Sequence, residues 1–171
     1  MTALDPALAQ LLDEAQVSRL VARYATMTDW LDWDGVRDLF TEDAQFDFGE
    51  MYHGGRDGYL AFVAPMEEGY DRRLHLFGMP RIDVTGDGAR AECASWIHTR
   101  NRGDAAHTDA VFAGRYVFEA RRTGEGWRLS RLAYFLNVLD VTNPPAGPEA
   151  PTRLADDWGP GHPERPYTQA R

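Results

Sequence analysis

The fold is decided by the stretch from residue 74 to residue 99, which reads LHLFGMPRIDVTGDGARAECASWIHT. Apolar and polar residues alternate on both sides of the tripeptide Gly86-Asp87-Gly88, with the period of two that is typical of β-strands. A glycine-containing pair between two such runs is a hairpin signal. We therefore predict two antiparallel strands, over Leu74–Val84 and Ala89–Thr99.

The same alternation continues toward the C-terminus. Two more long strands are predicted over Thr108–Arg121 and Gly126–Leu139, with a second hairpin signal, Thr-Gly-Glu-Gly, between them at residues 123–126. The connection over residues 101–106 is longer and polar. The chain thus predicts a meander of long antiparallel strands.

Ahead of these strands the apolar residues recur at helical spacing. An amphipathic helix is predicted over Leu11–Trp30, and a second over Asp34–Phe40 with aspartates available to cap it. A short strand over Ala44–Phe48 and a third helix over Arg56–Val63 follow. We expect Pro65 to end that helix, because proline has no N–H to donate. Helices followed by a meander predict an α+β fold.

Composition and charge exclude several functions. The chain has 171 residues, which suits one domain, and its 27 acidic against 18 basic side chains leave a net charge of −9 that would repel nucleic acid. It has no run of about 18 apolar residues that could span a membrane. The first ten residues do not have the pattern of a signal peptide, and the single cysteine, Cys93, cannot form an internal disulfide. We expect a cytoplasmic protein.

The C-terminal end differs in composition from the rest. Seven of the ten prolines fall between residues 141 and 171, together with several glycines and few apolar residues. Such a segment cannot offset its ordering entropy by burying apolar surface alone. We predict one domain over residues 1–140 and a tail over residues 141–171, either disordered or laid across the domain or a partner subunit.

Several segments resemble the SnoaL-like proteins, which have the cone fold of nuclear transport factor 2. They are Arg23-Tyr24-Ala25, residues 29–35, residues 39–44, the strand opened by His75, Gly114-Arg115-Tyr116 and residues 126–129. The resemblance covers roughly residues 15–138. It implies three helices packed on a strongly curved antiparallel or mixed sheet around a cone-shaped pocket, and a homo-oligomer, either a dimer or a trimer.

Within this family the chain resembles scytalone dehydratase, hexachlorocyclohexane dehydrochlorinase and bile acid 7-alpha-dehydratase. Asp29 and His75 match an aspartate at the end of the first helix and a histidine early in the long strand of these lyases. Tyr24 matches a tyrosine that the bile acid enzyme places five residues before its aspartate. The resemblance implies a cofactor-independent dehydratase or dehydrohalogenase that acts on an apolar cyclic or polyketide-like small molecule.

These residue types suit elimination, which needs a base for a proton and an acid for the leaving group. A histidine such as His75 serves both purposes near neutral pH, and Asp29 would fix its tautomer. Tyr24 would donate a hydrogen bond to the substrate. Five residues are about 140° around a helix, so Tyr24 and Asp29 share a cavity only if the helix ends near Asp29. His98 would be a second acid if its strand face is concave, and a surface or interface residue otherwise.

Large apolar side chains are expected to line the pocket: Trp30, Phe62, Phe77, Met79 and Trp96. By strand alternation Phe77 and Met79 share the face of His75. Aromatic residues also fill a plain core, and periodicity does not separate the two. The sequence has no glycine-rich phosphate loop after a strand and no two-histidine, one-carboxylate spacing, so we expect neither an organic cofactor nor a metal.

Other functions on the same fold stay open. The same pair of residues would serve a polyketide cyclase or an isomerase. A non-catalytic small subunit of an aromatic-ring dioxygenase, or a protein that only binds a ligand in the cone, belongs to another class. Each site residue also has a structural alternative: a solvated carboxylate for Asp29, a strand histidine for His75 and a core tyrosine for Tyr24.

Overall fold

Three helices and seven strands make up the computed structural model over the residues it describes, 5–103 and 105–145. In chain order they are α1 (Pro6–Asp29), α2 (Trp33–Leu39), β1 (Phe40–Asp47), β2 (His53–Gly55), α3 (Arg56–Glu68), β3 (Arg72–Phe77), β4 (Arg81–Thr85), β5 (Gly88–Asn101), β6 (Thr108–Thr123) and β7 (Gly126–Thr142). The predicted domain boundary at residue 140 falls inside β7, and the predicted tail from residue 146 onward lies outside the described residues.

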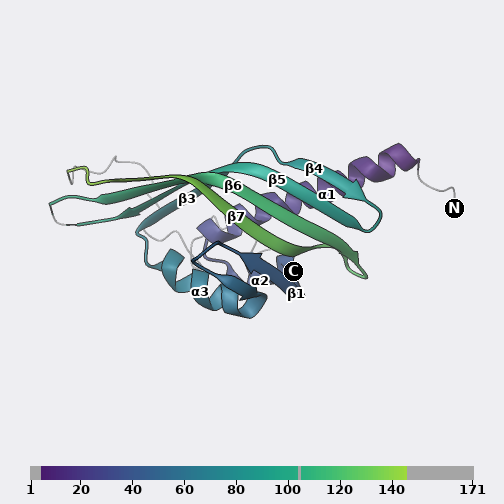
Figure 1. The fold of residues 1–171 in the computed structure, drawn as a ribbon, viewed down its shortest axis with the longest axis horizontal. Coiled ribbons are helices and arrows are strands. Elements are labelled where there is room, and N and C mark those ends of the chain that lie inside the picture. Colours follow the sequence, from purple (N-terminus) through teal and green to yellow (C-terminus); the bar gives the residue numbers. More distant parts are fainter. Residues whose placement is uncertain (1–4, 104, 146–171) are drawn as a thin grey trace.

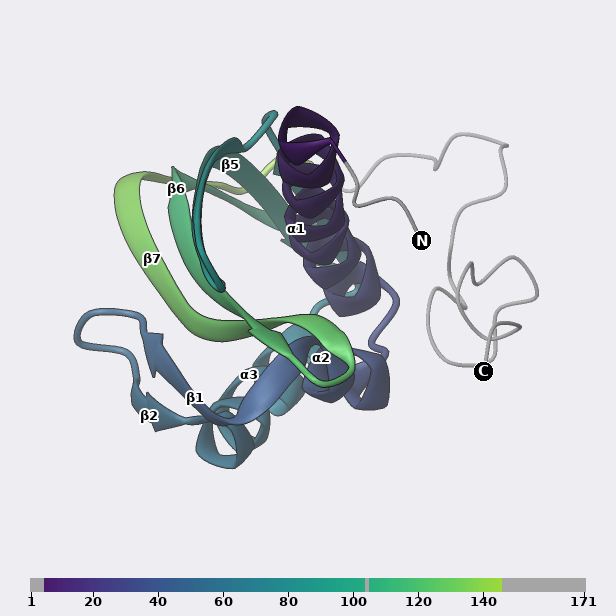
Figure 2. The same ribbon diagram turned by 90° about the vertical axis from the view of Figure 1, so that its right-hand side faces the viewer.

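The seven strands form one mixed, strongly curved sheet in the order β2-β1-β7-β6-β5-β3, with β4 paired to β5 beyond β3. The β1–β7 pair is parallel, and the other pairs are antiparallel. Figure 2 shows β5, β6 and β7 bending around the space that α1 flanks on one side and α2 and α3 close from below. Figure 1 shows the sheet extending past the helices. The predicted α+β cone is confirmed.

The helix α1 begins earlier than the apolar pattern indicates. The carboxylate of Asp5 accepts the backbone N–H of Ala7 at 2.8 Å, and Pro6 occupies the first helical position, where its missing N–H costs no helical hydrogen bond. Both are start signals, so the helix gains about a turn and a half before the predicted start at Leu11.

The expectation that Pro65 ends the third helix is wrong, because α3 continues to Glu68. A proline at this position leaves the carbonyl of Ala61, one turn earlier, without its helical partner. Ala61 and Pro65 both lie on the exposed side of α3, where water reaches that carbonyl. The last turn of α3 therefore forms, and it carries a residue of the site described below.

The expected single strand over Leu74–Val84 is two strands, β3 and β4, which pair with different parts of β5. The break falls at residues 78–80, where Pro80 has no N–H for a ladder. Both predicted hairpins are confirmed: Thr85 pairs with Gly88, and Thr123 with Gly126, each across two residues.

The core lies between α1 and the concave face of the sheet. Val17, Val21 and Tyr24 of α1 are at most 1% exposed and belong to one cluster with Cys93 and Phe118 of the sheet. Cys93 is a buried small side chain, and burial raises its pKa to about 11, so it stays a thiol. No described helix has the length and apolar character that a membrane span requires.

Candidate active site

The alternation of buried and exposed side chains along β5 shows which residues face the inside of the cone. Its odd-numbered residues from 89 to 99 are buried, whereas its even-numbered residues are exposed or partly exposed. On β3, which pairs with β5 so that His75 lies opposite Ile97, His75 is likewise buried. The inner side chains of both strands therefore face the same concave space.

Asp29 is positioned by the way α1 ends. The N–H of Asp32 donates to the carbonyl of Met27 at 2.8 Å, and the N–H of Leu31 donates to Thr28 at 3.0 Å. This pattern closes a helix when the residue after its cap is left-handed, and Leu31 has a φ of 55°. The helix stops at Asp29, whose carboxylate thus projects toward β3.

Asp29 and His75 form a buried pair. The ring Nδ1 of His75 lies 2.7 Å from Oδ1 of Asp29, and the backbone N–H of His75 donates to the two carboxylate oxygens at 3.0 and 3.1 Å. The two residues are 7% and 8% exposed. A carboxylate that accepts the Nδ1 proton holds the imidazole in one tautomer, which leaves Nε2 free for chemistry.

Charge near His75 outweighs the effect of its burial. Burial lowers the pKa of His75. The hydrogen bond to Asp29 and the negative charges of Glu67 and Asp29 raise this pKa, and together they outweigh burial, so the pKa of His75 lies above its ordinary value. The imidazole thus holds a proton more readily than a free histidine.

A second carboxylate, Glu67, faces the other side of the imidazole. Its Oε1 lies 3.8 Å from Nε2 of His75, and the residue is 5% exposed. Among the described residues, Oε2 of Glu67 has no hydrogen-bond partner, although Nε of Arg73 lies 3.9 Å away. Burial raises the pKa of Glu67, against the lowering effect of His75 and Arg73.

Glu67 is not among the site residues that the sequence predicts, because the predicted third helix ends at Val63. Tyr59, Leu60, Val63 and Glu67 are the buried residues of α3. Their spacing follows a helix, so a carboxylate on an apolar helix face was the signal available. The predicted third helix ends at Val63, before Pro65, so Glu67 falls outside it and is not recognised as part of the apolar face.

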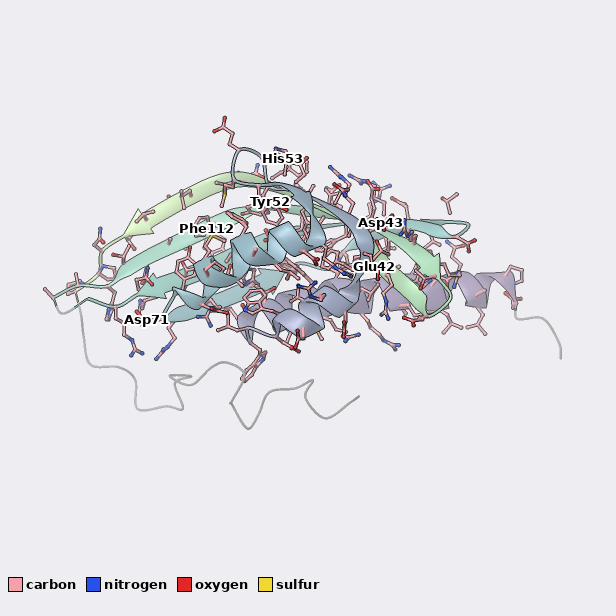
Figure 3. The ribbon with its side chains drawn as sticks, turned by 90° about the horizontal axis from the view of Figure 1, so that it is seen from below. Glu42, Asp43, Tyr52, His53, Asp71 and Phe112 are labelled. Carbon is pink, nitrogen blue, oxygen red and sulfur yellow. The ribbon has the colours of Figure 1, made fainter. Side chains whose placement is uncertain are left out.

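A cavity of about 390 Å³ opens beside His75 and Glu67. Most of its lining is aromatic or aliphatic, from α3, the β1–β2 loop and the inner faces of β5, β6 and β7: Tyr24, Phe48, Gly49, Glu50, Met51, Tyr59, Val63, Met66, Glu67, Tyr70, His75, Ile97, Thr99, Phe112, Tyr116, Tyr134, Leu136 and Leu139. Figure 3 looks from below, with α3 in front of the sheet and Phe112 labelled beside it.

Tyr24 lines this cavity together with His75, while Asp29 lies behind the imidazole. The hydroxyl of Tyr24 is 2.5 Å from that of Tyr59, and burial raises the pKa of both phenols. The two hydroxyls therefore stay protonated, and one of their protons is left over to donate. The structure brings Tyr24, Asp29 and His75 to one region.

Three other predicted residues lie outside this cavity. His98 and Trp96 occupy even positions on β5 and point to the outer face, where the His98 side chain is 41% exposed and Nε2 lies 3.5 Å from Oδ2 of Asp109. Met79 is 95% exposed, because β3 ends at Phe77 and strand alternation no longer applies. For His98 the second alternative, a surface position, applies, whereas the expectation that Trp96 and Met79 line the pocket is wrong.

The remaining predicted lining residues belong to the packing around the cavity. Phe77 is partly buried, and its ring lies 4.8 Å from that of Tyr116. Phe62 stacks on Tyr52 at 5.4 Å, and Trp30 is 8% exposed at the end of α1. Phe62 and Phe77 pack against the hydrophobic core, and none of these three residues lines the cavity.

A second cavity, of about 530 Å³, lies near Glu42 and Asp43, which Figure 3 labels. Four of its charged side chains form two pairs: Arg121 donates to Asp43 at 3.0 Å, and Arg128 donates to Glu125 at 3.1 Å. Within residues 5–103 and 105–145, no three His, Cys, Asp or Glu side chains are grouped as a metal site would require.

Comparison with known proteins gives matches of two kinds. The profile of the SnoaL-like domain matches residues 9–133. Among solved structures, the chain is similar to a candidate aromatic ring hydroxylase from Novosphingobium aromaticivorans, with 28% identity, 77% of this chain and 94% of that chain covered, and a TM-score of 0.69. An NTF2-like protein with a cystatin-like fold from the same organism has 26% identity, 76% and 85% coverage, and a TM-score of 0.63.

A more distant neighbour has a described enzymatic activity. It is a hexachlorocyclohexane dehydrochlorinase from Novosphingobium barchaimii, with 16% identity, 80% of this chain and 94% of that chain covered, and a TM-score of 0.70. At this identity the likeness concerns the fold. No curated protein matches the chain.

Proposed function

The chain belongs to the SnoaL-like domain family, and from this membership we propose that it is a cofactor-independent lyase, a dehydratase or dehydrohalogenase, that acts on an apolar cyclic or polyketide-like small molecule. The observation that carries the proposal is the buried Asp29–His75 pair, with Nδ1 and Oδ1 2.7 Å apart, at the wall of an apolar cavity. A histidine with a shifted pKa that is paired with a carboxylate in such a cavity is the usual form of an acid–base site.

Each residue has a role in this proposal. Asp29 accepts the Nδ1 proton of His75 and stabilises the imidazolium. His75 transfers a proton at Nε2, as general acid–base catalysis requires. The hydroxyl pair of Tyr24 and Tyr59, 2.5 Å apart, donates a hydrogen bond to an oxygen of the substrate, where negative charge grows as the carbon–hydrogen bond breaks.

The cavity sets the size and polarity of the substrate. Its volume of about 390 Å³ lies within the range of about 300–1,000 Å³ found for small-molecule sites. The carboxylate of Glu67 lies beside His75, whereas Val63, Ile97 and Phe112 contribute apolar surface. A compact ring system with one oxygenated edge fits this distribution.

The test is a screen followed by product analysis. The full chain is incubated with cyclic β-hydroxy ketones and with chlorinated cyclohexanes, and products are weighed by mass spectrometry. A product that is lighter by water or hydrogen chloride, and that does not form with His75→Gln, supports the proposal.

Three other outcomes contradict it. A product of unchanged mass indicates a cyclase or isomerase. Binding without conversion indicates a ligand-binding protein, and co-purification with a large iron-containing partner indicates a dioxygenase subunit. Each of these three outcomes contradicts the lyase.

We also propose that the chain forms a homo-oligomer through the outer face of the sheet. Leu76 and Trp96 lie opposite each other on β3 and β5 and are 61% and 52% exposed, and Phe135 on β7 is 55% exposed. Apolar patches of this kind mark interaction sites. Light scattering of wild type and of Trp96→Ser tests this: a mass of one chain in the wild type would contradict it. The cytoplasmic location stays a prediction.

A further inference from the structure

Among the residues that the structure describes, Glu67 is the buried carboxylate of the cavity lining that the proposed mechanism leaves without a role. It is 5% exposed, and Oε1 lies 3.8 Å from Nε2 of His75. Among the described residues Oε2 has no hydrogen-bond partner, although Nε of Arg73 lies 3.9 Å away. A purely structural carboxylate at this depth would be expected to be hydrogen-bonded, because an unsatisfied buried oxygen costs stability. An incompletely hydrogen-bonded carboxylate in a residue that lines the cavity points to a partner that arrives with the substrate.

We propose that Glu67 is a second catalytic residue, which shares one proton with His75 so that the pair always offers one base and one acid to a hydroxyl-bearing substrate. This inference rests on the proposed function and deepens it, because it assigns the leaving group. A departing hydroxide needs a proton, whereas a departing halide does not. The pair of Glu67 and His75 therefore suits a dehydratase, which needs both a base and an acid.

The number of shared protons follows from the charges in the cluster. Asp29 from α1 and Arg73 from β3 are oppositely charged and cancel, and the tyrosines around the cavity stay neutral because burial raises the pKa of Tyr24, Tyr59 and Tyr116. One proton between Glu67 and His75 then brings the cluster to zero net charge. No proton would leave it at −1 and two at +1, and burial disfavours a net charge.

The proton resides on His75 in the resting state. Its ordinary pKa is the higher of the two, and Asp29 and Glu67 raise it further. The starting point is thus an imidazolium beside a carboxylate that is more basic than usual, because burial raises the pKa of Glu67. A carboxylate of this kind is a better base, as general base catalysis requires.

The elimination step balances within the site. The Glu67 carboxylate takes the proton from the carbon next to the one that bears the hydroxyl, and the electron pair of that C–H bond forms the double bond. The C–O bond breaks, and the oxygen leaves as water with the proton from Nε2 of His75. Glu67 is then protonated and His75 neutral. A proton transfer from Glu67 back to Nε2, across a gap of 3.8 Å at rest, restores the starting state.

The first test needs no substrate. Long-range ¹H–¹⁵N NMR follows the protonation of His75 with pH in the full chain, and its signal is identified by its absence in His75→Gln. In Glu67→Gln the midpoint should fall by at least about one pH unit, the scale for losing an opposite charge within about 4–6 Å. Glu68→Gln, the neighbouring exposed residue with the same charge change, should leave it within about 0.3 unit. A midpoint in Glu67→Gln equal to that of wild type overturns the shared proton.

The second test uses the alcohol that the screen identifies. Turnover by the wild type should fall at both low and high pH, because either two protons or none removes one partner. Glu67→Gln should lose at least about 10²-fold in kcat and also lose the acid limb of the profile, whereas Glu68→Gln should keep both. Glu67→Asp retains the charge and should fall between them, which covers a Glu67→Gln chain that fails to fold. Full turnover in Glu67→Gln contradicts the assignment.

The two proposals fail in different ways. If no alcohol is converted but the NMR midpoint falls in Glu67→Gln, the lyase is wrong and the coupled pair stands. If an alcohol is dehydrated with equal rates by wild type and Glu67→Gln, the lyase stands and the role of Glu67 is wrong.

Discussion

Two histidine–aspartate pairs lie on opposite faces of the same sheet, and they differ in what surrounds them. His75 on β3 pairs with Asp29 inside the cone, and its side chain is 3% exposed. His98 on β5 lies near Asp109 on the outer face, 41% exposed, although its register partner Leu74 is the neighbour of His75. Both histidines lie on strands near an aspartate, and the two sites differ in the face of the curved sheet on which they lie.

The two aspartates are also committed differently. Asp109 receives Nε and Nη2 of Arg100 at 2.6 Å each, and these hydrogen bonds lower its pKa. Both carboxylate oxygens of Asp109 therefore accept hydrogen bonds from Arg100, and Nε2 of His98 lies 3.5 Å from Oδ2. Asp29 instead accepts both the ring and the backbone N–H of His75. The Asp29 carboxylate is thus committed to His75 at a buried position, whereas the Asp109 carboxylate is committed to Arg100.

The largest expected difference is in turnover. His75→Gln should reduce kcat/KM by at least about 10²-fold, because the general acid–base group is lost, while His98→Gln should stay within about twofold. Steady-state kinetics on the compound found in the screen measures both, and circular dichroism checks that each variant folds. Equal losses in the two variants would remove the distinction between the faces.

The second difference is in stability. Asp29→Asn places an amide N–H₂ against donors at a buried position, so the free energy of unfolding should fall by about 2 kcal/mol. The Asp109 side chain is 13% exposed, but its partner Arg100 is 34% exposed, and an asparagine there keeps one acceptor oxygen for the guanidinium. The same change at Asp109 should therefore cost less, about 1 kcal/mol. Urea denaturation of the two variants measures this. A larger loss at Asp109 than at Asp29 would show that the outer pair is the structural one.

Much of this arrangement is readable from the sequence, and the failures have physical causes. Alternation places Trp96 and His98 on one face but does not say which, because both faces of β5 carry apolar residues. The charged residues of β5 identify the outer face. Arg90 and Glu92 are even-numbered like Trp96 and His98, and charged side chains at alternate positions of a strand are typical of the face toward solvent.

Other parts of the site need three dimensions. Tyr24 matches a position, but its contact with Tyr59 joins residues 35 apart in the chain. Asp29 was placed correctly at the helix end, while the turn that stops the helix at that residue uses Leu31 in a conformation that favours glycine. No residue preference predicts a leucine there.

The third difference is in the pH dependence of stability. Because the pKa of His75 is raised in the folded state, the native chain binds more protons than the unfolded one, so stability falls as pH rises. The contribution is complete below the ordinary value of 6.5 and is lost through the raised value. Between pH 6.5 and 9 the free energy of unfolding of the wild type should therefore decrease.

Denaturation at several pH values decides whether that slope belongs to the inner pair. His75→Gln should flatten it, and His98→Gln should leave it unchanged. A slope that disappears in His98→Gln would assign the linkage to the outer face instead.

The smallest effect concerns the turn that positions Asp29 and has no equivalent at Asp109. Leu31 has a φ of 55°, and a leucine in this region costs about 1 kcal/mol that glycine does not incur. Leu31→Gly also loses the contacts of a half-buried side chain, so the net gain in unfolding free energy should be about 0.5 kcal/mol. Leu31→Ala loses the same contacts but keeps the strain, and it should lie about 1 kcal/mol below Leu31→Gly. If the two variants were equally stable, the turn would not be strained. If Leu31→Gly also left the His75 midpoint unchanged, the helix end would be set by its backbone hydrogen bonds alone, and the inner pair would be held independently of the residue that closes the helix.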